Sequence, residues 1–183
     1  MCLGFWRCAA NFKDNETERG RVNMTKWMYV FILGLVSIDQ SLKHLAKTYY
    51  EANWGKTQYS GHVDIIPNFL NVTYAENRGA AFGMLKDQQW FFILFTLSVI
   101  AVFIYLIECK KISNKLFLAS ATLLISGGFG NLIDRIYRGY VVDYLKFSIF
   151  PTVCNFADIC IVVGTVILGI YILFYYKSSK IRG

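Results

Sequence analysis

Four long apolar blocks constrain the fold of this 183-residue chain more than any other feature of its sequence. The first block covers residues 27–38 and continues through polar positions to about residue 46, and the others cover 90–107, 116–133 and 159–176. Each block can be extended to the roughly 20 residues that a helix needs to cross a bilayer. Hydrophobic residues make up 55% of the chain, more than a soluble domain of this size can bury. The sequence therefore predicts an all-α membrane protein with four transmembrane helices.

A cleaved signal peptide is the alternative for the first block. Cleavage would need small residues after Ile38, whereas the chain continues with the polar segment 39–43, Asp-Gln-Ser-Leu-Lys. We therefore expect an uncleaved helix. Residues 1–23 are polar or mixed and precede a second methionine, Met24, so we expect them to form a separate N-terminal extension.

The distribution of basic residues predicts the orientation of the helices. Lys and Arg cluster before the first block, between the second and third blocks and after the fourth, whereas acidic residues match them in the long link 47–87. By the positive-inside rule, both termini and the short central link lie in the cytoplasm. The predicted organisation is a cytoplasmic extension at 1–23, a membrane domain at 24–177 and a basic cytoplasmic tail at 178–183. We therefore attribute the net charge of +7 to the orientation of the helices in the membrane and not to binding of nucleic acid.

The outward-facing link 47–87 carries a β-strand signal. Over residues 70–75, Leu, Val and Tyr alternate with Asn, Thr and Ala, which is the two-residue period of a half-buried strand, and Gly79 and Gly83 supply turns nearby. We expect a small β-structured loop on the extracytoplasmic side, resting on the outer ends of the helices.

Ionisable residues collect near the outer ends of the predicted helices. Asp39 and Lys43 lie four positions apart, and so on one face of the first helix, where an ion pair would support a site. Asn131, Asp134 and Arg135 are expected to share a face of the third helix. Because each charge at the centre of a membrane helix costs about 2.5–3.5 kcal/mol, a purely structural bundle would avoid such a cluster. The cluster therefore predicts a functional site near the outer membrane surface.

Two aspartates are expected to meet at that depth. Asp143 lies in the outward link just past the third helix, and Asp158 lies in the first turn of the fourth helix, which Asn155 is expected to cap. Two close carboxylates share one proton, so together they hold a base and an acid. This pair can hydrolyse a peptide bond without a covalent intermediate, with Asp158 activating water and Asp143 protonating the carbonyl oxygen.

The sequence lacks the motifs of other hydrolytic mechanisms. It contains neither the HExxH pattern of metalloproteases nor the GxSxG pattern of serine hydrolases. The five cysteines form no CxxC pair, and His44 and His62 lack the spacing of metal ligands. We expect no metal and no cofactor.

A small proton-coupled transporter or channel component is the main alternative, because intramembrane Asp and Lys residues also mark ion paths. A path needs polar residues through the whole membrane depth, whereas the second and fourth blocks are apolar over their inner halves. A purely structural subunit is a third interpretation, and it leaves the charge cluster unexplained.

Five segments, in order, resemble the lipoprotein signal peptidases, the signal peptidase II family. They are residues 39–43, 77–83 (Asn-Arg-Gly-Ala-Ala-Phe-Gly), 127–135 (Gly-Gly-Phe-Gly-Asn-Leu-Ile-Asp-Arg), 139–143 and 155–158 (Asn-Phe-Ala-Asp). The resemblance covers about residues 26–176, and residues 1–23 have no counterpart in it. Cys154 stands where the family usually has an aromatic residue, and the stretch between Asp143 and Asp158 is short.

The resemblance implies an aspartic endopeptidase of the bacterial inner membrane. Members remove signal peptides from diacylglyceryl-modified prolipoproteins, cutting before the lipidated cysteine, so the implied partners are these substrates and membrane lipid. The family's catalytic aspartates fall on Asp143 and Asp158. Its supporting and substrate-binding residues fall on Asp39, Lys43, Asn77, Gly79, Asn131, Asp134, Arg135 and Asn155. With such a substrate, Gly79 and its loop would cover the scissile bond, and Asn77 and Arg135 would hold backbone carbonyls.

Overall fold

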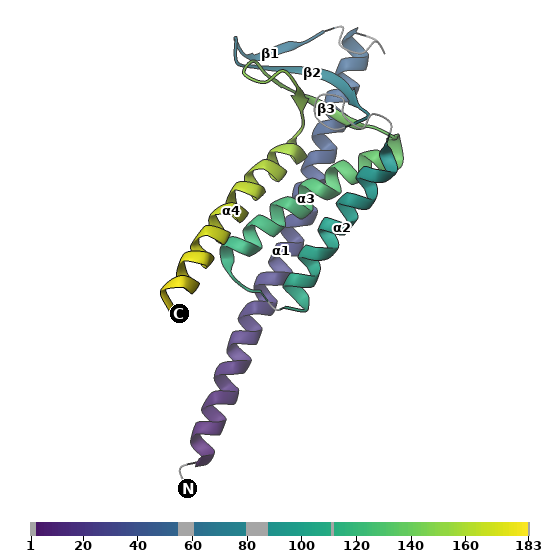
Figure 1. Cartoon of the computed structure of the whole chain (residues 1–183). Coiled ribbons are helices and arrows are strands. Elements are labelled where there is room, and N and C mark those ends of the chain that lie inside the picture. The colour runs from purple at the N-terminus through teal and green to yellow at the C-terminus, as the bar shows by residue number, and fades with distance from the viewer. Residues whose placement is uncertain (1–2, 55–60, 80–87, 111, 183) are drawn as a thin grey trace.

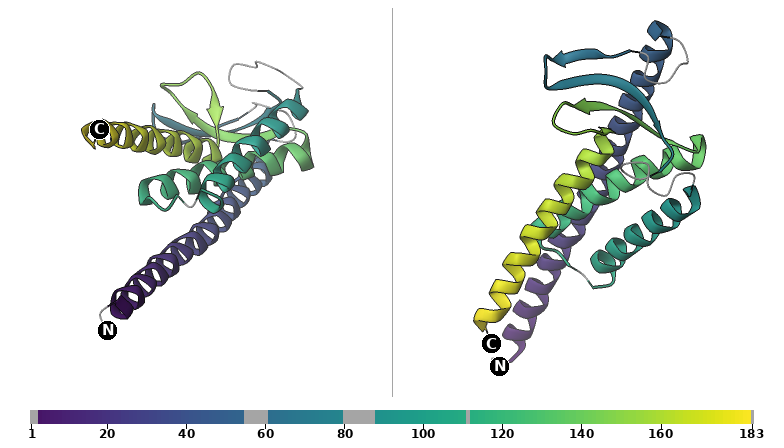
Figure 2. Two further views of the ribbon diagram at one scale, coloured as in Figure 1. Left: turned by 60° about the horizontal axis from the view of Figure 1, so that its bottom comes forward. Right: turned by 45° about the horizontal axis from the view of Figure 1, so that its top comes forward.

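The computed structural model describes residues 3–54, 61–79, 88–110 and 112–182, and within them the chain forms a helical bundle with one small sheet (Figure 1). The helices are α1 (Leu3–Trp54), α2 (Gln89–Glu108), α3 (Lys115–Arg138) and α4 (Phe156–Arg182). The strands are β1 (Val63–Ile66), β2 (Leu70–Asn77), β3 (Val141–Phe147) and β4 (Val153–Cys154). The sheet lies at one end of the bundle, and both chain termini lie toward the other end (Figures 1 and 2).

Three helical segments of the described chain are long and apolar enough to cross a membrane: Gln89–Glu108, Lys115–Arg138 and Phe156–Phe174. The large apolar side chains of α2 and α4 are mostly exposed, as expected for helices that face lipid. The apolar block of α1 is interrupted by Asp39, Gln40 and Lys43, so this helix does not meet the same criterion. The mostly helical membrane fold is confirmed, while a fourth span formed by α1 stays a prediction.

Helix α3 packs against each of the other three helices and contacts α4 most extensively (Figure 2). Its small residues allow this packing. A Cβ atom added at Gly127 would lie 2.4 Å from the Ala157 carbonyl oxygen, and one added at Gly130 would lie 2.5 Å from Asp39 Oδ2. Glycine at these positions therefore lets the start of α4 and the polar residues of α1 come close to α3.

The sheet is antiparallel, with the strand order β1-β2-β3-β4. Pairing of β2 with β3 places Ala75 opposite Asp143 and Asn77 opposite Val141, after an irregularity between Val72 and Ala75. The outer end of α1 packs on the sheet, where the Tyr50 and Tyr74 rings lie 5.2 Å apart. The β2 strand and the start of β3 are thereby held above the outer ends of the helices.

The observed elements differ from the predicted ones in two places. The first helix was predicted over about 27–46, but α1 runs from Leu3 to Trp54, through residues assigned to the N-terminal extension. The β-structure was predicted within 47–87, but it also takes in β3 and β4 from the link before α4. Residues 141–144 are all buried, so this strand lacks the polar–apolar alternation by which half-buried strands are recognised. Gly83 lies outside the described residues.

Candidate active site

Asp143 and Asp158 meet through one asparagine, Asn155. The Asn155 side-chain amide donates to Asp143 Oδ1 at 2.6 Å, and its backbone N–H donates to Asp158 Oδ2 at 3.1 Å. In return, the Asp158 N–H donates to Asn155 Oδ1 at 3.0 Å. This reciprocal exchange is the capping box of a helix N-terminus, so the predicted N-cap role of Asn155 is confirmed. The cap of α4 therefore also brings the two aspartates together.

Two more asparagines hold the remaining carboxylate oxygens. Asn77 donates to Asp143 Oδ2 at 3.0 Å, and its own oxygen accepts the Gly79 N–H at 3.0 Å, which fixes the orientation of the amide. Asn131 donates to Asp158 Oδ1 at 2.8 Å. All four oxygens of the aspartate pair thus accept a hydrogen bond. The side-chain amide of Asn77 holds Asp143 here, which differs from the role in binding a substrate carbonyl that the resemblance implied.

The environment of Asp143 favours its protonated form. Its side chain is buried, and burial, together with the nearby Asp158 carboxylate, raises the pKa of Asp143 to about 7. The hydrogen bonds from Asn77 and Asn155 act in the opposite direction but do not cancel the effect. Asp143 can therefore exchange a proton near neutral pH.

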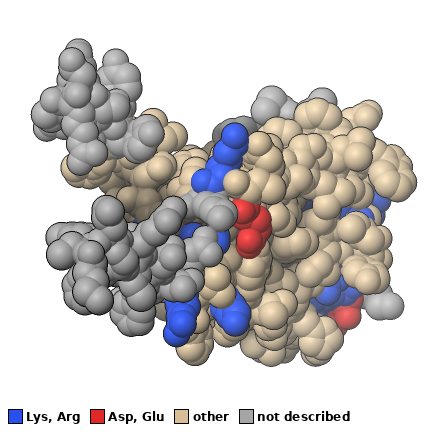
Figure 3. All heavy atoms as spheres, turned by 90° about the horizontal axis from the view of Figure 1, so that it is seen from below, with Lys and Arg blue, Asp and Glu red and all other residues tan. Residues whose placement is uncertain are grey.

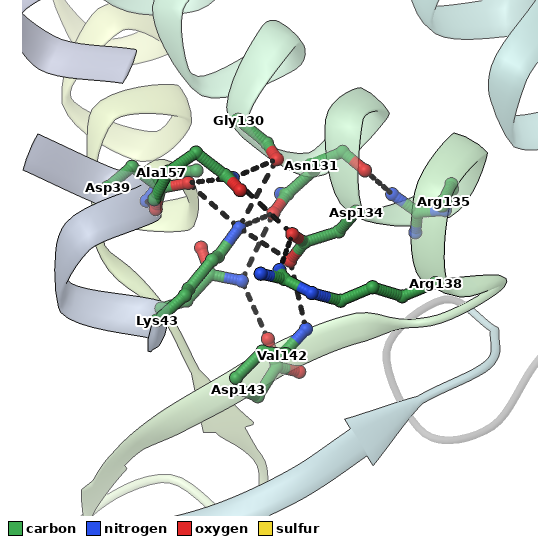
Figure 4. Close-up of polar contacts among 12 residues, drawn as sticks. Asp39, Lys43, Gly130, Asn131, Asp134, Arg135, Arg138, Val142, Asp143 and Ala157 are labelled. Atoms are coloured by element: carbon green, nitrogen blue, oxygen red, sulfur yellow. Dashed lines mark hydrogen bonds and ion pairs between the residues drawn. The ribbon is translucent and has the colours of Figure 1, made fainter. Parts of the chain in front are cut away.

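Lys43 lies at the centre of a second polar cluster, next to the aspartate pair (Figure 4). Its fully buried ammonium lies 2.9 Å from Asp39 Oδ2, 3.1 Å from Asp134 Oδ2 and 3.0 Å from Asn131 Oδ1. The predicted pairing of Asp39 with Lys43 is confirmed. A second cation, the Arg138 guanidinium, pairs with Asp134. Two carboxylates are thus balanced by two cations, which offsets the cost of burying them.

The two carboxylates of this cluster also hold the backbone beside the aspartate pair. Asp39 Oδ1 accepts the Ala157 N–H at 3.0 Å, and Ala157 immediately precedes Asp158. Asp134 Oδ2 accepts the Val142 N–H at 3.0 Å, and Val142 immediately precedes Asp143. Lys43, which bridges both carboxylates, therefore connects the backbone positions of the two aspartates.

Arg135 belongs to the other side of α3. Its guanidinium approaches the Gly79 carbonyl oxygen at 3.4 Å and stacks 4.7 Å from the centre of the Phe92 ring. Asp134 points toward Lys43 of α1, so the expectation that Asp134 and Arg135 share one face is wrong, because adjacent helical residues diverge by about 100°. Arg135 is positioned between α2 and the end of β2.

Two members of the polar cluster were not singled out from the sequence. The Gln40 side-chain amide donates to the Gly130 carbonyl at 3.0 Å and to Asp134 Oδ1 at 3.3 Å. Arg138 pairs with Asp134 one helical turn away. The i,i+4 spacing of Asp134 and Arg138 is a signal that could have identified the second pair. Gln40 had no comparable signal, because Gly130 and Asp134 lie on a different helix.

No group of three or more His, Cys, Asp and Glu residues suitable for a metal ion is found in the part of the chain that the structure describes. Cys154 is half-buried in β4, beside the aspartate pair, and burial raises the pKa of its thiol to about 11. This thiol is therefore a poor nucleophile or metal ligand at neutral pH. The expectation of a reaction without a metal stays a prediction.

Substitution of Gly130 by alanine should damage the polar cluster. The new Cβ would lie 2.5 Å from Asp39 Oδ2 and 3.0 Å from the Ala157 Cβ, so Asp39 must shift away from the Ala157 N–H. Overpacking of this kind costs typically about 1–3 kcal/mol. We expect Gly130→Ala to lower the thermal unfolding temperature in detergent. Gly34→Ala is the control, because a Cβ at Gly34 of α1 meets nothing within 4 Å. Equal unfolding temperatures for the two variants would contradict the packing argument.

The fold and the site together define a class of protein. Apolar helices surround a polar cluster at one end, and there a buried aspartate, Asp143, and a half-buried one, Asp158, share an asparagine and are held by amide donors. Such an arrangement is typical of an integral membrane protein in which a pair of carboxylates can act as acid and base.

Comparisons with known proteins give the family. Residues 31–174 match the family described as signal peptidase (SPase) II. A lipoprotein signal peptidase of Caldanaerobacter subterraneus is 42% identical over 145 residues, which cover 79% of this chain and 94% of that protein. A lipoprotein signal peptidase of Clostridioides difficile is 45% identical over 121 residues, covering 64% and 80% of the two chains. The chain belongs to the signal peptidase II family and is a peptidase.

The fold agrees with that of a solved structure described as a bacterial membrane enzyme. The TM-score is 0.69 at 28% sequence identity, and the match covers 80% of this chain and 92% of the other. The family resemblance stated from the sequence motifs is confirmed by the family match and by the two relatives above.

Proposed function

We propose that this protein is an aspartic endopeptidase that removes signal peptides from diacylglyceryl-modified bacterial prolipoproteins, cutting before the lipidated cysteine. The observation that carries the mechanism is the contact of Asn155 with both Asp143 and Asp158. Family membership supports the substrate class, since the relatives are lipoprotein signal peptidases.

In the proposed reaction, Asp158 acts as the base and Asp143 as the acid. Asp158 takes a proton from a water molecule as the water oxygen attacks the scissile carbonyl carbon. Asp143, whose pKa of about 7 keeps it partly protonated, donates its proton to the carbonyl oxygen. The resulting tetrahedral diol collapses as Asp158 gives its proton to the leaving amine and a diol hydroxyl returns its proton to Asp143, so that the C–N bond breaks, the carboxylic acid forms and the pair again holds one shared proton. Asn131 and Asn155 keep Asp158 oriented throughout.

The remaining site residues have positioning roles in this proposal. Asp39 and Asp134 hold the backbone before each catalytic aspartate, and Lys43 holds both of these carboxylates. Asn77 orients Asp143, and Arg135 lies beside Gly79, where a substrate backbone would approach the aspartate pair. Gly79 is positioned to form one wall of that approach.

We further propose the bacterial inner membrane as the location, with α1 as the fourth span, both termini in the cytoplasm and the sheet outside. The proposed organisation keeps residues 1–23 as a cytoplasmic extension, 24–177 as the peptidase domain and 178–183 as a basic tail. At the end of the molecule nearest both termini, Lys and Arg are more prominent than Asp and Glu on the described surface (Figure 3). This asymmetry supports the orientation by the positive-inside rule.

Cleavage of a defined substrate tests the function directly. The purified protein would be incubated in detergent with a prolipoprotein carrying the diacylglyceryl group and, in parallel, with the same precursor lacking it. We expect release of the signal peptide from the lipidated precursor only. Absence of cleavage by a folded protein, or equal cleavage of both precursors, would contradict the proposed specificity for lipidated prolipoproteins.

Labelling of single cysteines tests the orientation. In a cysteine-free background, His62→Cys next to β1 should react with a membrane-impermeant maleimide added outside spheroplasts. Lys110→Cys, at the opposite end of α2, should react only after the membrane is opened. The reverse pattern would place the active site on the cytoplasmic side and contradict the proposed location.

The pH dependence follows from Asp143. Because its pKa is raised to about 7, the proton that it must donate is lost as the pH rises through 7, so kcat should fall on the alkaline side. Ionisation of Asp143 also costs more in the folded state than in the unfolded state, so stability should decline between about pH 4, where the carboxyl ionises in the unfolded chain, and about pH 7, and should change little above that. A profile of kcat against pH checks the first point. His44→Gln and His62→Gln are controls that should leave the alkaline limb in place.

A further inference from the structure

The two hairpins of the sheet end in exposed apolar turns. Ile149 and Phe150, in the turn between β3 and β4, are 68% and 58% exposed, and Ile65 at the end of β1 is 57% exposed. Ile66 and Phe69, which flank the turn between β1 and β2, are also exposed. We refer to these five residues as the apolar tip. None of them contributes to the polar cluster or to the aspartate pair.

The apolar tip is one connected surface. The Ser148 N–H donates to the Phe69 carbonyl oxygen at 2.9 Å, which joins the two turns through the backbone. The Phe69 and Phe147 rings meet edge to face, with their centres 5.8 Å apart. The exposed side chains of the two hairpins are therefore held together on a rigid support. A contiguous exposed apolar surface of this kind marks an interaction site.

The position of the apolar tip identifies its partner. Four residues separate Phe150 from Asn155, the cap of α4, so the turn lies within roughly 15–20 Å of the start of that helix. The surface of α4 that faces away from the bundle is apolar, with Val162 and Val166 each more than half exposed. The ribbon views show the hairpins projecting beyond the helical bundle near the sheet end of α4 (Figures 1 and 2). The apolar tip is thus adjacent to the lipid-facing surface of α4.

We propose that the apolar tip inserts into the lipid leaflet on the active-site side and anchors the sheet at the membrane surface. The tip would lie at the boundary between the lipid headgroups and the acyl chains, where aromatic and branched apolar side chains bind favourably. Lys146, exposed on β3 next to this surface, is placed to contact anionic headgroups. Because β2 and β3 carry Asn77 and Asp143, this anchor sets the depth at which the aspartate pair meets its substrate.

Fluorescence of a label at the tip tests this proposal independently of peptidase activity. A cysteine-free chain carrying the inactivating change Asp143→Asn would receive Ile149→Cys, and the new thiol would be labelled with the environment-sensitive fluorophore NBD. The protein would be reconstituted in vesicles of phosphatidylethanolamine and phosphatidylglycerol, with and without lipids that carry a nitroxide on the acyl chain. The matched control is Asn53→Cys, an exposed polar position near the C-terminal end of α1 and outside the apolar tip.

We expect a blue-shifted emission and strong nitroxide quenching at position 149, and weak quenching at position 53. Adding Ile66→Ser and Phe150→Ser should lower the quenching at position 149 to the level of the control. Equally weak quenching at both positions would overturn the proposal. A blue shift that depends on protein density in the vesicles and comes without quenching would also overturn it, because a second copy of the chain would then cover the tip. Signal-peptide release by the chain without Asp143→Asn, measured separately, reports on the proposed function alone.

Discussion

Replacement of either proposed catalytic aspartate, Asp143 or Asp158, by asparagine should nearly abolish cleavage of a lipidated prolipoprotein while leaving the protein folded. Asparagine keeps the size of the side chain and removes its ability to exchange a proton. General acid–base catalysis is typically worth about 10²–10⁴-fold per group, so Asp143→Asn and Asp158→Asn should each lower kcat by at least that factor. The double variant should be scarcely worse than either single variant, because the two groups act as a unit.

Stability separates this effect from misfolding. Asp143→Asn removes a carboxylate that is costly to ionise in its buried position, but it also turns one amide donor, Asn77 or Asn155, toward another donor. Because these effects oppose each other, the variant should remain folded above pH 7. Asp64→Asn serves as a matched control, since Asp64 is an exposed carboxylate in the same sheet and contacts only His62 among the ion pairs described. Near-normal turnover in a folded Asp143→Asn or Asp158→Asn protein would remove the aspartic mechanism.

The largest loss of stability is expected from Lys43→Met. Methionine resembles lysine in length but carries no charge, so Asp39 would lose its cation and Asp134 would keep only Arg138. Removing one partner of a buried ion pair typically costs about 3–5 kcal/mol, because a charge is left uncompensated. Activity should fall as well, since both carboxylates hold the backbone beside the aspartate pair. Thermal unfolding in detergent and cleavage of the same substrate measure the two effects.

Lys47→Met, one helical turn further along α1, is the matched control. The Lys47 ammonium lies 3.9 Å from Glu51 at a partly exposed position, where an ion pair contributes at most about 1 kcal/mol. We expect little change in unfolding temperature or turnover. Similar losses in the two lysine variants would mean that the buried position of Lys43 has no special importance.

Local patterns were sufficient to predict most of the helical structure. The second helix was predicted at 90–107 and is observed at Gln89–Glu108, because a continuous apolar run of this length has no alternative in a membrane. The pairing of Asp39 with Lys43 followed from their spacing on one helix, and the cap at Asn155 followed from its place before α4. Each of these features depends on neighbours within about four residues.

The alignment of the strands could not be predicted in the same way. Asn77 reaches Asp143 because β2 pairs with β3, and the two residues are 66 positions apart in the chain. The sequence of β3 shows no alternation of polar and apolar residues, because residues 141–144 are buried on both faces of the strand. Its β conformation is evident only from its hydrogen bonds to β2 and β4.

The candidate site residues could be recognised from residue type alone, because charged and amide side chains within apolar segments are costly in a membrane protein and mark functional positions. Their hydrogen-bond partners became evident only in the folded chain. Asp39 accepts the Ala157 N–H across 118 positions of sequence, and Lys43 bridges α1 to α3, because Gly127 and Gly130 let three helices meet closely. The physical reason is that a side chain's chemistry is intrinsic, whereas its hydrogen-bond partners depend on how distant segments pack.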